Sequence, residues 1–459
     1  MQKHDPEILT GSLWRGVLRF ALPLAATGLL QQLFNAADIA VVGRIGAEEG
    51  KIAMAAVGSN SPVINLVVNL FVGVSLGANV VLANRAGRGD REGVSRGAHT
   101  AVLLSLVCGT AAAVLCECAA APLLRAMGVP ADVYSDALRY LRIYLLGLPV
   151  ILLTNFEAAI FRSQGDTRTP FFCLVGVGAL NVALNLFFVF VLGMTVEGVA
   201  IATVLSNLAC SLVLFFLLGR GREETRIYLR RLAFHGDSLR NILIVGLPAG
   251  IQSMLFSVAN IFIQTAINSL DTTVMAASAA AFNLEILAYY FYSAFGQACA
   301  TFVGQNHGAG NLDRCRKTLA VCLAEGLLAC AAGSAVLLLG GRGMLRFFNE
   351  DPEVVAYGYI RLFYISIAYL FSVQADVYSG YLRGFGMSFI PAAISVAGVC
   401  GVRLAWIYLA FYPAPSFARL MLAYPISMSI SAGAILTACL LVRPSRRLAE
   451  KERPPEPIR

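Results

Sequence analysis

Charged side chains are scarce in this chain, and their scarcity decides its class. Only 14% of the 459 residues are charged, 58% are hydrophobic, and the mean hydropathy is +0.72. Globular chains contain about 25% charged and about 45–50% apolar residues, so soluble receptors and soluble structural proteins are excluded. Apolar runs long enough to cross a bilayer, about 20 residues per helix, recur along the whole length. We therefore expect a polytopic α-helical membrane protein.

Patterns typical of metal centres and of nucleotide chemistry are missing as well. The four histidines are scattered, the eleven cysteines contain no C-x-x-C pair, and neither H-E-x-x-H nor a Walker motif occurs. These absences argue against zinc sites, disulfides and bound nucleotide. We expect no enzyme activity, no cofactor and no metal other than Na⁺.

The basic residues of the chain lie mainly at the ends of its apolar runs. The net charge is +8, and most Lys and Arg residues flank these runs, which indicates membrane topology and anionic lipid headgroups instead of nucleic acid. Connections that follow even-numbered runs are richer in Arg, so the positive-inside rule predicts that both termini are cytoplasmic. We expect a monomeric, multi-pass protein of the inner (plasma) membrane, in contact with the lipid bilayer.

The apolar runs predict twelve transmembrane helices. Their approximate bounds are 17–43, 54–82, 98–124, 139–161, 170–192, 197–219, 241–267, 275–303, 318–340, 357–382, 389–411 and 418–442. We expect an N-terminal six-helix lobe at 1–218, a cytoplasmic linker at 219–241, a C-terminal six-helix lobe at 242–443 and a disordered cytoplasmic tail at 444–459.

The two halves of the chain share sequence markers at a constant offset. Gly87, Gly89, Arg162, Gly165 and Pro170 recur 221 positions later as Gly308, Gly310, Arg383, Gly386 and Pro391. This offset predicts an all-α fold of two six-helix bundles related by an internal repeat. Two similar lobes can enclose a site at mid-membrane and open it to either side, as a transporter requires. The four glycines of the first two marker pairs are expected in cytoplasmic turns.

Asp38 is the strongest candidate for an ion site. An ionisable side chain at mid-bilayer costs at least about 2.5–3.5 kcal/mol and needs a partner or a water-filled cavity. Asn181 and Asn185 lie one helical turn apart on one face of the fifth span, and Thr203 lies on the sixth. One carboxylate, two amides and a hydroxyl suit a monovalent cation such as Na⁺, whereas the carboxyl group alone could exchange protons. Packing of the two amides between helices is the structural alternative.

A second polar group belongs to the C-terminal half. Glu285 and Asp376 lie in apolar spans beside a cluster of aromatic residues that includes Tyr289 and Tyr292. Rings and acids would suit a bulky, amphipathic cation, and lipid contact is the alternative for the rings. The predicted substrate cavity comprises Gln31, Asn35, Gln252, Glu285, Tyr289, Tyr292 and Asp376. Glu157, about one turn from the end of its span, is expected to reach water.

Prolines recur near the start of each half. Pro23 lies in the first span and Pro248 in the seventh. A proline inside a helix frees a carbonyl group and permits bending, so both positions are predicted hinges. Bending of the first span would change the surroundings of Asp38.

Five segments together carry a family resemblance over nearly the full length of the chain. They are LPLAATGLLQQLFNAADIAVVGRIG, GANVVLANRAGRGD, IFRSQGDTRTP, VEGVAIATVLSN and GQNHGAGNLD. With twelve spans and a central linker, the chain resembles the multidrug and toxic compound extrusion family. The resemblance implies two six-helix bundles facing each other in a V, and export of small drug-like substrates, organic cations among them, in exchange for Na⁺ or H⁺.

The resemblance also implies roles for particular residues. Asp38, Asn155, Asn181 and Thr203 match residues that form a cation site in the N-terminal lobe of family members. Asn185 departs from the family pattern, because members often have Asp there, so one negative charge is missing and the coupling ion stays open. We expect a secondary antiporter that exports amphipathic, often cationic drugs or toxic metabolites by alternating access. A lipid-linked oligosaccharide flippase of the same superfamily is the alternative, although it would need an arginine-rich cavity.

Overall fold

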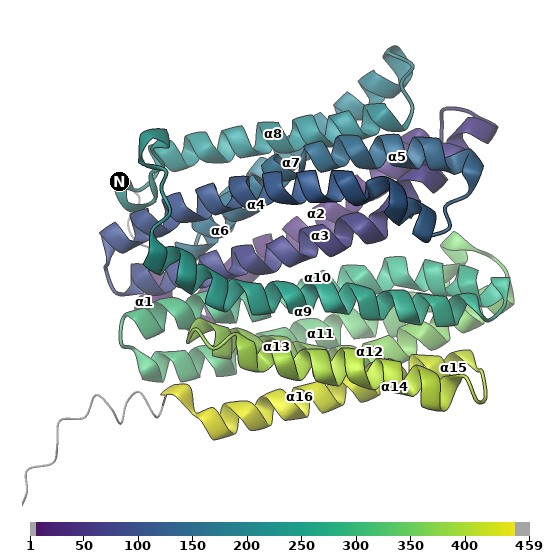
Figure 1. Cartoon of the computed structure of the whole chain (residues 1–459). Coiled ribbons are helices and arrows are strands. Elements are labelled where there is room, and N and C mark those ends of the chain that lie inside the picture. The colour runs from purple at the N-terminus through teal and green to yellow at the C-terminus, as the bar shows by residue number, and fades with distance from the viewer. Residues whose placement is uncertain (1–5, 446–459) are drawn as a thin grey trace, which may run out of the picture. The chain divides into compact units, whose positions relative to one another are not determined.

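The fold is helical throughout the residues that the structure describes. This computed structural model describes residues 6–445, which form α-helices joined by short turns, with no β-strand in this range. The first half contains α1 (Pro6–Leu9), α2 (Leu13–Val42), α3 (Ala47–Gly87), α4 (Arg91–Ala126), α5 (Ala131–Leu146), α6 (Leu148–Ser163), α7 (Arg168–Leu186) and α8 (Val196–Arg220) (Figure 1). The second contains α9 (Gly236–Asn268), α10 (Thr272–Gly308), α11 (Leu312–Phe348), α12 (Pro352–Gly384), α13 (Phe389–Ser395), α14 (Val402–Trp406), α15 (Phe417–Met421) and α16 (Ala423–Val442).

The prediction of an all-α membrane protein with twelve spans is confirmed. Within residues 6–445, eleven helices are long and apolar enough to cross a membrane, and the bent pair α5–α6 makes twelve. That pair covers the predicted fourth span and bends by 48°. The break falls at Gly147, and Pro149 follows in the first turn of α6. Proline cannot continue the hydrogen bonding of a preceding helix, which explains why a single apolar run folds as two helices.

Contacts group the chain into two compact units. Unit 1 contains residues 26–82 and 91–246, and unit 2 contains residues 6–25, 83–90 and 247–445, among the described residues. The core of unit 1 is formed by apolar residues of α3, α4, α5 and α8, and the core of unit 2 by those of α10, α11, α12 and α16. Within α2 the chain passes from unit 2 to unit 1 after Ala25, and within α9 it passes from unit 1 to unit 2 after Gly246.

The structure describes the predicted linker but not most of the predicted tail. Between α8 and α9 the chain forms two short 3₁₀ turns, Glu223–Thr225 and Leu229–Arg231, and the predicted linker extends into both flanking helices. It packs against α4 of unit 1, where the backbone N–H of Tyr228 donates to Nε2 of His99 at 3.0 Å. The lobe boundaries remain a prediction, and the predicted tail lies outside the described residues from position 446 onward.

The repeated glycines have two distinct functions in the backbone. Gly89 and Gly310 adopt φ of 71° and 75°, the left-handed region that glycine enters without steric cost, which confirms turns at these positions. Gly87 and Gly308 are instead the last residues of α3 and α10. In unit 2 a Cβ on Gly87 would clash with the carbonyl oxygen of Gln305, and one on Gly308 with that of Asn84. These two glycines thus permit close backbone approach, which corrects their assignment as turn residues.

Small residues also allow α10 and α12 to pack closely in unit 2. A Cβ on Gly380 of α12 would clash with the carbonyl oxygen of Gly296 on α10. Close approach through glycine is common between membrane helices, because van der Waals packing, and not the hydrophobic effect, holds such helices together. This contact fixes the helix that carries Glu285 against the one that carries Arg361 and Asp376.

We expect Gly380→Ala to destabilise the fold, because the added methyl group has no room. Overpacking of this kind costs about 1–3 kcal/mol. Gly401→Ala is the matched control: it places the same methyl group in a helical segment of the same unit, where no heavy atom lies within 4 Å. Thermal unfolding of the purified protein in detergent should show a lower midpoint for Gly380→Ala only. Equal midpoints for the two variants would contradict the close packing of α10 and α12.

Candidate functional site

Asp38 lies at the centre of a buried polar cluster in unit 1. Its side chain on α2 is 7% exposed. The amide nitrogen of Asn185 on α7 donates to Oδ1 of Asp38 at 2.6 Å. The hydroxyl group of Thr203 on α8 lies 3.3 Å from Oδ2 and can donate to it, or to the carbonyl oxygen of Val199 at 2.9 Å. Three helices that are distant in sequence therefore converge on one carboxylate.

The two asparagines of α7 complete the cluster. Asn185 Nδ2 also lies 3.3 Å from Oδ1 of Asn181, and both side chains are buried. Oδ1 of Asn185 is buried, and the described residues offer it no hydrogen-bond donor. The segment Phe187–Val191 continues α7 as a π-helix, a local widening that is frequent at functional sites. Two amide oxygens, one carboxylate and one hydroxyl are the hard oxygen ligands that a monovalent cation prefers.

Two other polar residues of unit 1 lie outside these hydrogen bonds. Asn155, which we expected at the cation site, donates through Nδ2 to the carbonyl oxygen of Ile151 in its own helix, and no hydrogen bond joins it to Asp38. Glu157 is 0% exposed and lies beside Ser211 of α8, so the expectation that it reaches water is wrong. Glu157 lies on the buried face of α6, which also includes Phe156 and Ile160.

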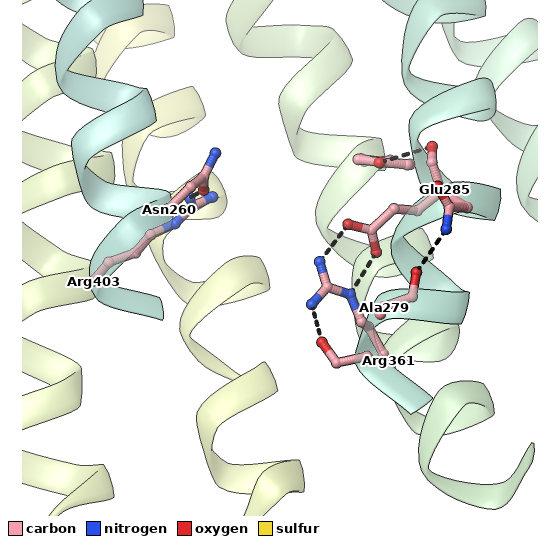
Figure 2. Close-up of polar contacts among 8 residues, drawn as sticks. Asn260, Ala279, Glu285, Arg361 and Arg403 are labelled. Carbon is pink, nitrogen blue, oxygen red and sulfur yellow. Dashed lines mark hydrogen bonds and ion pairs between the residues drawn. The ribbon is translucent and has the colours of Figure 1, made fainter. Parts of the chain in front are cut away.

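In unit 2 the acid Glu285 is neutralised by a partner that the sequence analysis did not single out. Arg361 of α12 donates to both carboxylate oxygens of Glu285, from Nη2 at 2.6 Å and from Nε at 2.9 Å (Figure 2). Its third nitrogen, Nη1, donates to the hydroxyl group of Ser278 at 2.6 Å. Both charged side chains are buried. A bidentate pair of this kind is among the strongest hydrogen-bonded contacts in proteins, so Glu285 is not a free acid.

The predicted aromatic cluster is present beside this pair. Tyr289 and Tyr292 of α10 have ring centroids 5.3 Å apart, and Tyr369 of α12 lies 4.9 Å from Tyr292. The hydroxyl group of Tyr369 donates to the backbone carbonyl oxygen of Glu285 at 3.0 Å. Tyr289 is 40% exposed whereas Tyr292 is 1% exposed, so only the former can contact a substrate without rearrangement.

The remaining candidate residues are the polar residues of the predicted substrate cavity and the two predicted hinge prolines. Asp376 lies close enough to Arg383 for electrostatic attraction, and Nη2 of Arg383 donates to the side-chain oxygen of buried Gln252 at 2.7 Å. Gln31 and Asn35 are exposed on α2 of unit 1. Pro23 and Pro248 lie inside α2 and α9 as predicted, each within one turn of the point where its helix passes from one unit to the other.

Arg403 is, with Arg361, one of the two buried arginines among the described residues of unit 2. It belongs to α14, which lies between the π-helical segments Val396–Gly401 and Ile407–Phe411. Its Nη1 donates to the side-chain oxygen of Asn260 at 3.0 Å, a pair seen apart from Glu285 in Figure 2. Its Nε donates to the hydroxyl group of Ser427 at 3.2 Å, and its guanidinium carbon lies 4.4 Å from the ring centroid of Tyr424.

The described residues contain no group of three or more His, Cys, Asp or Glu side chains placed to hold a metal ion. Two G-x-S-x-G sequences occur, at 73–77 and 93–97, but both lie within the helices α3 and α4. A hydrolase nucleophile of this motif sits on a sharp turn between a strand and a helix. These serines therefore lack the backbone geometry of a catalytic nucleophile.

Comparison with known families identifies the fold and its duplication. The MatE family model matches residues 23–187 and 248–409. The chain belongs to the MatE family of multidrug and toxic compound extrusion transporters. The two matched segments correspond to the two copies of the predicted repeat. At the level of the family, this protein is a multi-pass membrane transporter and not an enzyme.

Relatives and solved structures agree with the family. The probable multidrug resistance protein YoeA of Bacillus subtilis is 25% identical over 431 residues, which cover 92% of each chain. A protein named FAD transporter from Shewanella oneidensis is 25% identical over 358 residues, covering 76% of this chain and 77% of its own. The outward-facing structure of a multidrug resistance MATE family transporter has a TM-score of 0.87 at 22% identity, covering 97% and 99% of the two chains, which confirms the two-bundle fold.

The MatE chain also contains functional candidates that sequence reasoning missed. Arg361 lies within the predicted tenth span, and a buried arginine there signals an acidic partner. Glu285 and Arg361 were nevertheless not paired, because they lie on different helices and no sequence spacing connects them. The hydrogen bonds of Arg403 to Asn260 and Ser427 were missed for the same reason.

Truncating one partner of the Glu285–Arg361 pair should strongly destabilise this transporter. Loss of one partner leaves a buried charge without compensation and costs about 3–5 kcal/mol. We expect large losses of thermal stability in Glu285→Leu and in Arg361→Met, and recovery of most of that loss in the double variant. Thermal unfolding of the four proteins forms a double-mutant cycle. Additive losses, with the double variant the least stable, would contradict a direct pairing.

Proposed function

We propose that this MatE protein is a secondary antiporter that exports amphipathic, drug-like small molecules in exchange for Na⁺ or H⁺ by alternating access. The proposal rests on the buried carboxylate of Asp38, held by donors from α7 and α8 in a chain of the MatE family. The relatives support a small-molecule substrate, because one is named a probable multidrug resistance protein and another an FAD transporter. Cytoplasmic termini in an inner (plasma) membrane and a monomeric state are part of the same proposal.

The ion site consists of Asp38, Asn181, Asn185 and Thr203. An arriving Na⁺ would replace the amide donor on the carboxylate and use the orphaned Oδ1 of Asn185 as a ligand after rotation of that amide, which requires a turn of one side chain and no backbone movement. A proton would bind Asp38 directly. In either case the transported ion removes the negative charge of a single buried group.

Coupling requires that the ion bind the two conformations unequally. A ligand with equal affinity for both states shifts no population, however tightly it binds. Asp38 lies in the half of α2 that belongs to unit 1, and Pro23 lies in the half that belongs to unit 2. Bending at Pro23 would change the direction of the α2 segment that carries Asp38. We propose that this bending links ion occupancy to the conformational change.

The substrate region is proposed from the unit 2 candidates Gln252, Tyr289, Tyr292 and Asp376, and the assignment of Gln31 and Asn35 remains a prediction. The pairing of Glu285 with Arg361 removes one of the two acids that would attract an organic cation. The flippase alternative required several arginines around a pyrophosphate. Of the buried arginines in unit 2, Arg361 is saturated by Glu285 and Ser278, which does not favour that alternative.

We expect Asp38→Asn to abolish gradient-driven efflux, because the isosteric amide retains the packing but neither releases a proton nor contributes a negative charge to a cation site. Ethidium efflux from energised proteoliposomes, with either a Na⁺ or a pH gradient imposed, measures the activity and identifies the coupling ion. Asp136→Asn is the matched control, because it removes an acid of unit 1 that lies outside the site and pairs with Arg139. Unchanged efflux by Asp38→Asn under both gradients would disprove the coupling role.

A further inference from the structure

We propose that Arg403 forms an anion-binding site in unit 2, which receives a carboxylate or phosphate group of the transported substrate. The inference rests on the proposed export function and specifies its substrate class: amphipathic molecules that carry an acidic group. It starts from an unbalanced charge. Arg403 is 3% exposed, and no carboxylate among the described residues lies within ion-pair distance of it.

Every contact of the Arg403 guanidinium is neutral. Nη1 donates to the amide oxygen of Asn260, Nε donates to the hydroxyl group of Ser427, and the remaining contact is the ring face of Tyr424. Buried charges in proteins are normally paired with an opposite charge, because transfer of an isolated ion from water into an apolar interior is costly. Arg361, on the neighbouring α12, meets this rule through Glu285, whereas Arg403 does not.

The charge excess is local and lies around one ring. The guanidinium carbons of Arg361 and Arg403 lie 5.9 Å and 4.4 Å from the centroid of Tyr424. The only carboxylate hydrogen-bonded to either arginine, within the described part of the chain, belongs to Glu285. Two guanidinium groups and one carboxylate leave a net charge of about +1, and a substrate anion would compensate it. The planar fork of arginine can bind a carboxylate or phosphate through two hydrogen bonds.

A polar path leads along α9 to this site. Asn260, Gln264 and Asn268 follow each other at intervals of four residues, so they share one face of the helix, and all three are exposed. The side chain of Gln264 donates to that of Asn268 at 2.8 Å, and Asn268 is the last residue of α9. Amides in contact with lipid hydrocarbon are costly, so the proposal requires that this face of α9 border water. Rotation of the Asn260 side chain would expose Nη1 of Arg403 to it.

The internal repeat relates residues that contact Asp38 in unit 1 to residues near Arg403 in unit 2, although the counterparts of Asp38 and Arg403 themselves are Ala259 and Val182. An offset of 221 residues relates Thr203, which contacts Asp38, to Tyr424, and relates Tyr140 to Arg361. The π-helical segments Phe187–Val191 and Ile407–Phe411 occupy nearly the same place in the two copies. Thr203 thus contacts an acid in unit 1, whereas its counterpart Tyr424 contacts guanidinium groups in unit 2. The first arrangement suits a cation and the second an anion.

A purely structural arginine is the competing explanation. Arg403 joins α9, α14 and α16 through its hydrogen bonds, and such a role would affect stability and all ligands alike. An anion site would instead change the preference of the protein between ligands of opposite charge. The test therefore measures selectivity, which a structural role would leave constant.

The experiment uses the full chain in lipid nanodiscs and measures equilibrium binding of three fluorescent probes. Carboxyfluorescein and flavin mononucleotide are aromatic anions, and ethidium is an aromatic cation. We expect the native protein to bind at least one anion, and Arg403→Gln to lower the ratio of anion to ethidium affinity at least tenfold. Arg403→Lys should retain part of this ratio, because it keeps the charge and loses the fork. Arg346→Gln, which removes an exposed arginine of α11, should keep the ratio within twofold.

Three results would overturn the inference: absence of binding of both anions to the native protein, an unchanged affinity ratio in Arg403→Gln, or equal weakening of anions and ethidium in that variant. Binding in nanodiscs needs no gradient, so it is independent of coupled transport. Failure of gradient-driven efflux in the native protein, with anion binding intact, would reject the proposed antiport and leave the anion site standing. Gradient-driven ethidium efflux without anion binding would support the proposed antiport and reject the anion site.

Discussion

Burial of ionisable side chains in bilayer-spanning helices is the constraint on which the polar architecture of this protein depends. The hydrocarbon core offers no water to unsatisfied polar groups, so each buried charge is compensated within the bundle or awaits a ligand. Glu285 and Arg361 compensate each other, and Asp38 receives donors from two helices. Arg403 has neutral partners only. Asp38 and Arg403 are the two groups to which we assign ligands in the proposals above.

The repeat separates what duplication preserved from what diverged. Backbone features persist, since Gly89 and Gly310, and Gly165 and Gly386, all adopt positive φ. The side chains at equivalent depth have diverged into an acidic cluster in one unit and a predominantly basic one in the other. In the proposals above, this divergence gives unit 1 a site for a cation and unit 2 a site for an anion.

The sequence predicted the fold well because length and hydropathy alone decide where a chain can cross a bilayer. It also brought Asp38, Asn181, Asn185 and Thr203 together correctly, since an isolated acid and two amides on one helix face are conspicuous in apolar spans. It failed where the outcome depended on helix packing. Glu157 was expected to reach water, and the packing of α6 buries it. The partner of Glu285 could not be found from spacing, because α10 and α12 meet only in the folded bundle.

The division of α2 between the two units has a mechanical consequence. Residues up to Ala25 pack with unit 2, and residues from Ala26 onward, Asp38 among them, pack with unit 1. Communication from Asp38 to unit 2 then needs no relay of side-chain contacts, whose existence is often hard to demonstrate. In the proposed mechanism the continuous backbone of α2 transmits displacement between its two segments. The stiffness of α2 near Pro23 then determines how much of a movement at Asp38 reaches the segment that packs with unit 2.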